Sequence, residues 1–339
     1  MNSPNHNSTD PQTKESVGVI LFQLGGPDTY DAIEPFLNNL FNDPDIIDIP
    51  LGFLLRKPLA KFISSRRSVE VEELYREMGG PSPIREITNK QAEMLRDELR
   101  KRDPERDYHA FVAMRYWHPL TGETVEQVKA ADVDRLILLP LYPHYSKTTT
   151  GSSFKEWERR IKDTKLSDLP SDTIRAYPDY QPYIKAMVNK VKRTIDGCCG
   201  AVEPLHLLFS AHGVPLKAIK SGDPYQDHIE TTVKHIIEGL STDYPHYISY
   251  QSKVGPQKWL QPSTIDKLEQ LGEEGVKHLL VVPVAFVSDH LETLHELNIQ
   301  DRVIAEDAGI EHYHVMPALN DSPEFINALA QRVLEEIEK

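Results

Sequence analysis

Short apolar runs, separated by longer polar segments, constrain the fold of this chain more than any other feature of its sequence. Each run has five to eight residues and is rich in Val, Ile, Leu and aromatic residues, which is typical of a buried strand. The runs cover residues 17–24, 108–114, 136–142, 205–211, 247–251 and 279–286. Helices are expected between and after them, among them residues 28–41, 84–101 and 323–338. Strands that alternate with helices predict an α/β fold with parallel sheets.

A faint internal repeat divides the chain into two similar halves. Three residues recur at a constant offset: Val133, Leu136 and Pro140 correspond to Val276, Leu279 and Pro283. The segment LFQLGG at 21–26 also resembles LFSAHG at 208–213. We therefore expect two similar doubly wound, Rossmann-like domains, each with a four-stranded parallel sheet, and a cleft between them.

The length of the chain also favours two domains, because 339 residues exceed what one hydrophobic core usually supports. Residues 155–182 are charged and rich in loop formers, which marks a crossing between domains. The predicted division is a disordered tail at 1–15, a first domain at 16–165 and a second at 166–319. A C-terminal helix within 320–339 is expected to pack back on the first domain.

Composition narrows the classes of function. The net charge of −14 argues against nucleic acid as a main partner, and no apolar run approaches the roughly 20 residues of a membrane span. The polar N-terminus lacks a secretory signal pattern, and the only cysteines, Cys198 and Cys199, are adjacent and poorly placed for a disulfide. These features predict a cytoplasmic protein.

A row of acidic residues follows the last apolar run. Asp289 is a good N-cap residue and has capping-box spacing to Glu292, so a helix is expected to begin there. At about 100° per residue, Asp289, Glu292, Glu296 and Gln300 fall within roughly 80° of one another. Such a row can be a solvated helix face. Because it directly follows a strand and includes His290 and His295, we interpret it as a site for a divalent ion or a proton relay.

Other candidate residues stand at or just past strand ends, where ligands bind in doubly wound folds. His212 ends an apolar run before a glycine; it is either a satisfied core histidine or a base at a cleft, with Glu292 and Glu296 opposite it. The remaining candidates offer an aromatic surface and one cation: Tyr116, Tyr142, Trp259, Phe286 and Arg115. A flat apolar ligand with carboxylate arms fits this inventory better than a nucleotide.

Two further segments have open interpretations. Residues 51–67 mix large apolar residues with Lys and Arg and contain no acid. They predict either a buried helix with basic ends or an exposed apolar lip with a basic rim, suited to a hydrophobic ligand or an anionic membrane surface. The Thr- and Ser-rich residues 148–153 form either a capped loop or an anion nest, and the nest would favour a phosphate-ligand enzyme.

The chain resembles the ferrochelatases, of bacterial type, over almost its whole length, from about residue 17 to 318. The resemblance lies in GVILFQLGGP, GGPSPI, MRYWHP, LPLYPHYSKTTTGSS, FSAHGVP, YQSKVGPQKWLQP and VPVAFVSDHLETLHELNI. It implies a lyase of haem and porphyrin biosynthesis that inserts Fe²⁺ into protoporphyrin IX to give protohaem, with release of two protons. A coproporphyrin III ferrochelatase, a cobalt chelatase of the same fold and a non-catalytic haem or porphyrin carrier are the alternatives.

The resemblance also implies roles for individual residues. His212, Glu292 and Glu296 match the catalytic positions, and His212 and Glu292 are expected to meet the metal. The residues expected around the porphyrin are Leu24, Arg115, Tyr116, Tyr142, Trp259, Phe286, Asp289 and His290. The required chemistry is bending of the ring and removal of both pyrrole protons, which we assign to the pocket and to His212.

The sequence departs from the family pattern at two positions, and each departure affects what we expect of the site. Lys147 stands where some relatives have a cysteine, and no cysteine lies near residue 339, so no iron–sulfur cluster and no tightly bound cofactor are expected. Gln300 stands where some relatives continue the acidic row. Residues 51–67 match the lip of the pocket, which favours a peripheral contact with the inner membrane. Monomer and homodimer are both open.

Overall fold

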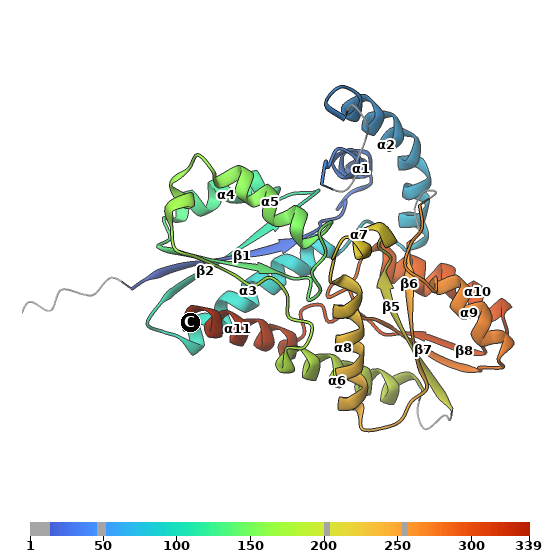
Figure 1. Cartoon of the computed structure of the whole chain (residues 1–339). Coiled ribbons are helices and arrows are strands. Elements are labelled where there is room, and N and C mark those ends of the chain that lie inside the picture. The colour runs from blue at the N-terminus through green and yellow to red at the C-terminus, as the bar shows by residue number, and fades with distance from the viewer. Residues whose placement is uncertain (1–13, 46–51, 200–203, 253–256) are drawn as a thin grey trace, which may run out of the picture.

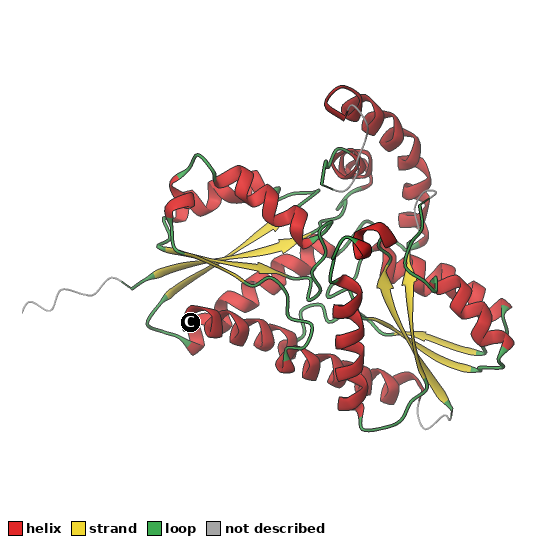
Figure 2. Ribbon diagram, viewed as in Figure 1, coloured by secondary structure: helices red, strands yellow, loops and turns green. Residues whose placement is uncertain are grey.

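Two four-stranded parallel sheets, each covered by helices, lie side by side in the molecule (Figures 1 and 2). This computed structural model describes residues 14–45, 52–199, 204–252 and 257–339. The first sheet consists of β1 Ser16–Gln23, β2 Asp107–Met114, β3 Arg135–Pro140 and β4 Ser171–Thr173. The second consists of β5 Leu205–His212, β6 His246–Gln251, β7 His278–Pro283 and β8 His312–Val315.

The two sheets have the same strand order, β2-β1-β3-β4 and β6-β5-β7-β8, and neighbouring strands in both sheets run parallel. The internal repeat is part of this symmetry. Phe22 pairs with Pro140 in the first sheet, and Ser210 pairs with Pro283 in the second. The predicted α/β fold with two similar four-stranded parallel sheets is therefore confirmed.

The fourth strand of each sheet was not located from the sequence. Strand β4 pairs with β3, so the first sheet extends to Thr173, past the boundary expected at residue 165. Of the expected tail, residues 1–13 lie outside the described residues, and β1 begins at Ser16.

Helices cover both faces of each sheet (Figure 2). On the first sheet these are α3 Ile84–Arg102, α4 Thr121–Ala131 and α5 Thr150–Ile161, and on the second α8 Tyr225–Leu240, α9 Thr264–Glu273 and α10 Asp301–Asp307. Helices α6 Gln181–Thr194 and α11 Pro323–Ile337 lie between the halves, while α7 Leu216–Lys220 follows β5. Short 3₁₀ or π segments occupy Tyr30–Ala32, Lys165–Asp168 and Ile195–Cys199, and a longer π-helix, η4, spans Glu292–Gln300.

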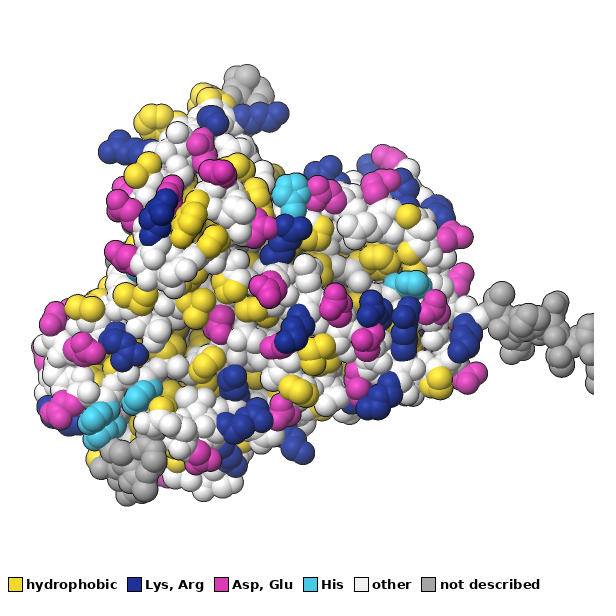
Figure 3. All heavy atoms as spheres, turned by 180° about the vertical axis from the view of Figure 1, so that it is seen from behind, with side chains coloured by type: hydrophobic (Ala, Val, Ile, Leu, Met, Phe, Trp, Pro, Cys, Tyr) yellow, Lys and Arg dark blue, Asp and Glu magenta, His cyan; other side chains and the backbone are white. Residues whose placement is uncertain are grey.

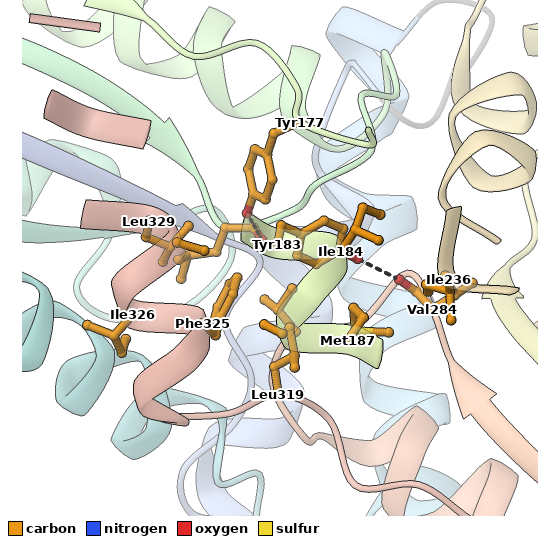
Figure 4. Close-up of a cluster of buried hydrophobic side chains, with 14 of the residues drawn as sticks. Tyr177, Tyr183, Ile184, Met187, Ile236, Val284, Leu319, Phe325, Ile326 and Leu329 are labelled. Carbon is orange, nitrogen blue, oxygen red and sulfur yellow. Dashed lines mark hydrogen bonds between the residues drawn. The ribbon is translucent and has the colours of Figure 1, made fainter. Parts of the chain in front are cut away.

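One continuous core joins the two halves. Successive strand residues point to opposite faces, so Val17, Val19 and Leu21 of β1 face a core that also contains Leu207 and Phe209 of β5. Between the sheets this core is filled by α6 and α11, where Tyr183, Met187, Phe325 and Leu329 pack together (Figure 4). Helix α11 contacts α3 of the first half as well as α6.

Two further helices stand above the sheets. Helix α1 Ile33–Phe41 packs against α2 Gly52–Glu77, which rises from the body of the molecule (Figure 1). Ile33, Leu37, Val71 and Tyr75 form a small core of their own, and Leu291, just before η4, packs against it. The α1–α2 pair therefore connects to the segment that carries the acidic row.

Candidate active site

His212 and Glu292 form a hydrogen-bonded pair at the carboxyl end of the second sheet. The Nδ1 atom of His212 lies 2.9 Å from Oε2 of Glu292. His212 is the last residue of β5, and a Cβ atom on Gly213 would lie 2.8 Å from the carbonyl oxygen of Gln251, so only glycine fits after it. The His212 side chain keeps 37% of its surface accessible and therefore faces open space. The two residues are in direct contact and do not stand opposite one another as expected.

The acidic row lies on a π-helix that begins later than predicted. Helix η4 begins at Glu292, with Leu291 at its N-cap. The capping role predicted for Asp289 is wrong, because its carboxylate accepts hydrogen bonds from the Thr293 hydroxyl, the Ala318 N–H and the Asn320 side-chain amide. Asp289 therefore anchors the segment after β8 and is 8% exposed.

The second carboxylate of the row is held by the end of β6. Glu296 accepts hydrogen bonds from the N–H of Ser252 at 2.9 Å and from its hydroxyl at 2.7 Å. Ser252 follows β6 and also lowers the pKa of Glu292. The side-chain amide of Gln251 donates to the carbonyl of Glu292 at 3.4 Å. The ends of β5 and β6 thus fix both carboxylates.

The protonation states of these groups depend on one another. Burial disfavours the charged imidazole of His212, but attraction and hydrogen bonding by Glu292, with Glu296 adding to them, raise its pKa above the ordinary value. Burial disfavours ionised Glu292 as well, but His212 holds the pKa of this carboxyl well below its usual range. Burial and the charge of Glu292 raise the pKa of Glu296. Once His212 is protonated, it and ionised Glu292 carry opposite charges, and Glu296 is the carboxyl that binds a proton more readily.

Aromatic rings surround the pair. Phe286 lies edge-on to His212, with ring centroids 6.5 Å apart, and its centroid is 4.7 Å from that of His290. Burial lowers the pKa of His290, whose Nδ1 lies 3.1 Å from the carbonyl oxygen of Ser288. Since a carbonyl only accepts, Nδ1 carries the hydrogen and Nε2 of the neutral ring is an acceptor. The backbone of Trp259 pairs with that of Pro215 in an isolated antiparallel β-bridge, and the Trp259 ring lies next to Gly213.

The candidates from the first half gather at the carboxyl ends of β1, β2 and β3, around a buried acid. Oδ2 of Asp43 lies 2.9 Å from a guanidinium nitrogen of Arg115 and accepts hydrogen bonds from the hydroxyls of Tyr116 at 2.6 Å and Ser152 at 2.7 Å. Arg115 is thus charge-compensated, and Tyr116 is fully buried behind the surface. No hydrogen bond or ion pair within the described ranges joins this group to the His212 group.

Tyr142 and Leu24 are the remaining candidates from this half. Leu24 follows β1, is partly exposed, and its carbonyl accepts the N–H of Tyr116. Burial raises the pKa of Tyr142, whose hydroxyl has no hydrogen-bond partner among the residues that the structure describes.

Several residues of the site were missed from the sequence. Asp43 and Ser252 lie in loops where polar residues are common, so no pattern marked them. His295, expected in the acidic row, is 4% exposed, and its Nε2 lies 2.7 Å from Glu77 of α2, where it ties η4 to the protruding helix. Tyr75 of α2 is also buried, and the charge of Glu292 contributes to raising its pKa.

A groove of about 810 Å³ elsewhere in the molecule contains none of the predicted site residues. It lies between the loop after β3, the segment after β4, the start of α8 and the end of α11. Its lining includes Lys147, Arg175, Arg332 and Lys339. Neither His212 nor Glu292 lines this groove, so the candidate site lies elsewhere in the molecule.

The sequence is similar to those of proteins from one known family. The family model described as ferrochelatase matches residues 16–337. The ferrochelatase of Synechococcus sp. (strain RCC307) is 47% identical over 321 residues, which cover 94% of this chain and 81% of that protein. The ferrochelatase of Trichodesmium erythraeum (strain IMS101) is 44% identical over 327 residues, with 95% and 83% covered.

Solved structures support the fold. The sirohydrochlorin chelatase SirB from Bacillus subtilis subspecies spizizenii, in complex with cobalt, is similar with a TM-score of 0.51 and 10% identity, and 96% of each chain is covered. SirB from Bacillus subtilis with Fe³⁺ has a TM-score of 0.50 and 11% identity, with 95% of each chain covered. At these identities the similarity concerns the fold alone.

Proposed function

The chain belongs to the ferrochelatase family, and we propose how its own residues insert Fe²⁺ into protoporphyrin IX to give protohaem and two protons. The observation that carries the proposal is the contact between His212 and Glu292, 2.9 Å apart, at the open end of the second sheet. Because a carboxylate only accepts, Nδ1 of His212 donates to Glu292. In the neutral imidazole the lone pair of Nε2 is then free to meet substrate.

Removal of the pyrrole protons follows from this tautomer. A free-base porphyrin carries two N–H groups, and each N–H bond must break before its nitrogen binds iron. Nε2 of His212 takes the proton of one pyrrole nitrogen, and the Nδ1 proton passes to Glu292. The electron pair of the N–H bond stays on the pyrrole nitrogen, which can then bind Fe²⁺. A second transfer of the same kind removes the other proton after Glu292 has passed on the first and exchange with solvent has returned the imidazole to the tautomer with its hydrogen on Nδ1.

Glu296 is the proposed next acceptor. Its raised pKa means that it takes up a proton more readily than Glu292 does. The hydroxyl of Ser252 donates a hydrogen bond to Glu296, and Ser252 also lowers the pKa of Glu292, so this residue interacts with both carboxyls. Protons thus leave the pair along η4. We assign the approach of Fe²⁺ to His212 and Glu292, which supply an imidazole nitrogen and a carboxylate oxygen.

The walls of the pocket are proposed to bind the ring in a bent shape, since a pyrrole lone pair meets the metal only when it leaves the plane of the macrocycle. Phe286, Trp259 and Leu24 are partly exposed and offer apolar surface for this purpose. Tyr142 and His290 are proposed to complete the contacts. Tyr116 and Arg115, held by Asp43, support the wall from behind.

We further propose that the protein is cytoplasmic and that α2 contacts the anionic surface of the inner membrane. Leu55, Leu59 and Phe62, at helical spacings of four and three, are 50%, 40% and 65% exposed, and Lys57 and Lys61 flank them. Figure 3 shows hydrophobic and basic side chains together on this projection. Apolar residues beside cations suit the boundary between headgroups and acyl chains. No helix in the described ranges is long and apolar enough to cross a bilayer.

No iron–sulfur cluster and no tightly bound cofactor form part of the proposal. A cluster is usually held by four cysteine thiolates, and the 339 residues contain two cysteines, Cys198 and Cys199, which are adjacent. Lys147 donates to the carbonyl of Ser221 and is not a cluster ligand. Fe²⁺ enters the proposed reaction as a substrate.

The substrate assignment is tested by anaerobic insertion assays with Fe²⁺ or Co²⁺ and with protoporphyrin IX or coproporphyrin III. We expect the highest kcat/KM for Fe²⁺ with protoporphyrin IX. A clear preference for coproporphyrin III would reassign the porphyrin, and a preference for Co²⁺ would reassign the metal. Binding of porphyrin without turnover, under conditions in which a related ferrochelatase is active, would point to a carrier.

A further inference from the structure

Asp301 is a buried carboxyl that the mechanism above does not use. It directly follows η4, is the first residue of α10 and is only 2% exposed. Its Oδ2 atom is buried and has no hydrogen-bond partner anywhere in the described ranges. A buried carboxylate that lacks both a cation and a hydrogen-bond donor is costly, and a proton is the simplest means of neutralising it.

The geometry of the π-helix places Asp301 next in line after Glu296. A π-helix has i→i+5 hydrogen bonds, and the N–H of Asp301 donates to the carbonyl of Glu296. The residue one π-turn beyond Glu296 is therefore Asp301. Gln300, which an α-helical spacing would align with the acidic row, is exposed. The row therefore turns inward at its end and does not stop at Gln300.

Among the charged and titratable groups around Asp301, Glu296 influences the pKa of its carboxyl. Burial raises the pKa of Asp301 to about 7, and the charge of Glu296 contributes to this rise. Tyr313 of β8 faces it, but the Tyr313 hydroxyl donates to the carbonyl of Leu297. Arg302, next to it in α10, donates to the carbonyls of Tyr313 and Asn298 and to the side chain of Asn298. Neither group supplies a donor to the buried oxygen.

We propose that Asp301, and not Gln300, is the third carboxyl of the row and takes up a proton that Glu296 releases. In this step the O–H bond of Glu296 breaks and an O–H bond to Asp301 forms, so that Glu296 becomes ionised and ready for the next proton from the His212–Glu292 pair. The proposal rests on the proton path assigned to Glu292 and Glu296 above. It makes Asp301 a proton acceptor outside the pocket, without contact to the porphyrin.

The test compares Asp301→Asn with wild type over a range of pH. Well below pH 7 the wild-type residue is already protonated and resembles asparagine, so the two proteins should insert Fe²⁺ at similar rates. Well above pH 7 the wild-type carboxylate accepts protons and the amide does not, so kcat of the variant should fall several-fold relative to wild type. Asp307→Asn, which changes an exposed acid of the same helix, is the matched control and should equal wild type at every pH.

A second readout does not depend on turnover. Infrared difference spectra should show a protonated-carboxyl band in wild type and Asp307→Asn that disappears as the pH rises through about 7, and Asp301→Asn should lack it. A kcat ratio that does not change with pH, or a band in Asp301→Asn that keeps its wild-type intensity and still disappears near pH 7, would overturn the role of Asp301. Failure of the wild type to insert iron would instead overturn the proposed function and leave the infrared result intact.

Discussion

The pair formed by His212 and Glu292 predicts how insertion depends on pH. Only neutral His212 accepts a proton, and Glu292 raises the pKa of His212. The rate should therefore fall as the pH drops through a value above the ordinary 6.5 of histidine. In Glu292→Gln this stabilisation of the imidazolium is lost, so the acid limb of the kcat/KM profile should move to lower pH while the maximal rate falls.

Glu296→Gln provides the contrast to this variant. It leaves the contact between His212 and Glu292 in place and removes only the next acceptor, so its loss of rate should be smaller, and its acid limb should lie close to that of wild type. A larger loss in Glu296→Gln than in Glu292→Gln would show that the order of the two carboxyls is wrong.

Asp301 also predicts how stability depends on pH. Its pKa is about 7 in the folded protein, against an ordinary value of 3.8, so the folded state holds a proton that the unfolded state has already lost between these values. The contribution of Asp301 is therefore complete below pH 3.8 and lost as the pH rises through about 7, by several kcal/mol. Asp301→Asn should unfold at a higher urea concentration than wild type at about pH 8, and this difference should shrink at about pH 5. A constant difference would contradict the buried-acid interpretation.

At the scale of elements, helix α2 carries a testable surface. Replacing Leu55 and Phe62 together by serine removes apolar area that already faces solvent, so the fold should hold while binding to anionic vesicles weakens. Sedimentation with vesicles of mixed neutral and anionic lipids measures this effect. Val303→Ser is the control, because Val303 is 56% exposed on α10, away from the lip. Equal binding by all three proteins would exclude the membrane contact.

The strands of the site were predictable, but the helix that carries the acids was only partly so. Apolar runs located β1, β2, β3, β5, β6 and β7, since burial on both faces leaves a continuous pattern. The helix after β7 was expected as an α-helix beginning at Asp289, from its capping pattern. The π-register of η4 depends on tertiary contacts such as those of Asp289 with residues 318–320, which local sequence does not encode.

The dependence on tertiary contacts also explains which contacts the sequence did not predict. His212 and Glu292 were expected to face each other, whereas they bond directly, because the ends of β5 and β6 hold η4 against the sheet. Strands β4 and β8 have sequences SDT and HYHV, which are too short and too polar for a pattern to mark them.

At the scale of the molecule, the shared core predicts cooperative unfolding. Phe325 of α11 is fully buried and packs edge-on against Tyr183 of α6, between the two sheets. Phe325→Ala should lower the free energy of unfolding by about 3–5 kcal/mol. The two halves should still unfold in one transition, followed by circular dichroism and tryptophan fluorescence. Val303→Ala, at an exposed site, is the control. Two separated transitions in wild type would contradict a single core.

The imidazole at the end of β5, held by a carboxylate from η4, is the group that we propose removes the pyrrole protons. The most direct measurement is the initial rate of Fe²⁺ insertion into protoporphyrin IX by wild type and His212→Ala, with porphyrin binding measured in parallel by fluorescence quenching. Because His212 faces open space, the variant should fold and bind porphyrin, yet show no insertion above the uncatalysed rate. Substantial turnover by folded His212→Ala would contradict this role of the imidazole.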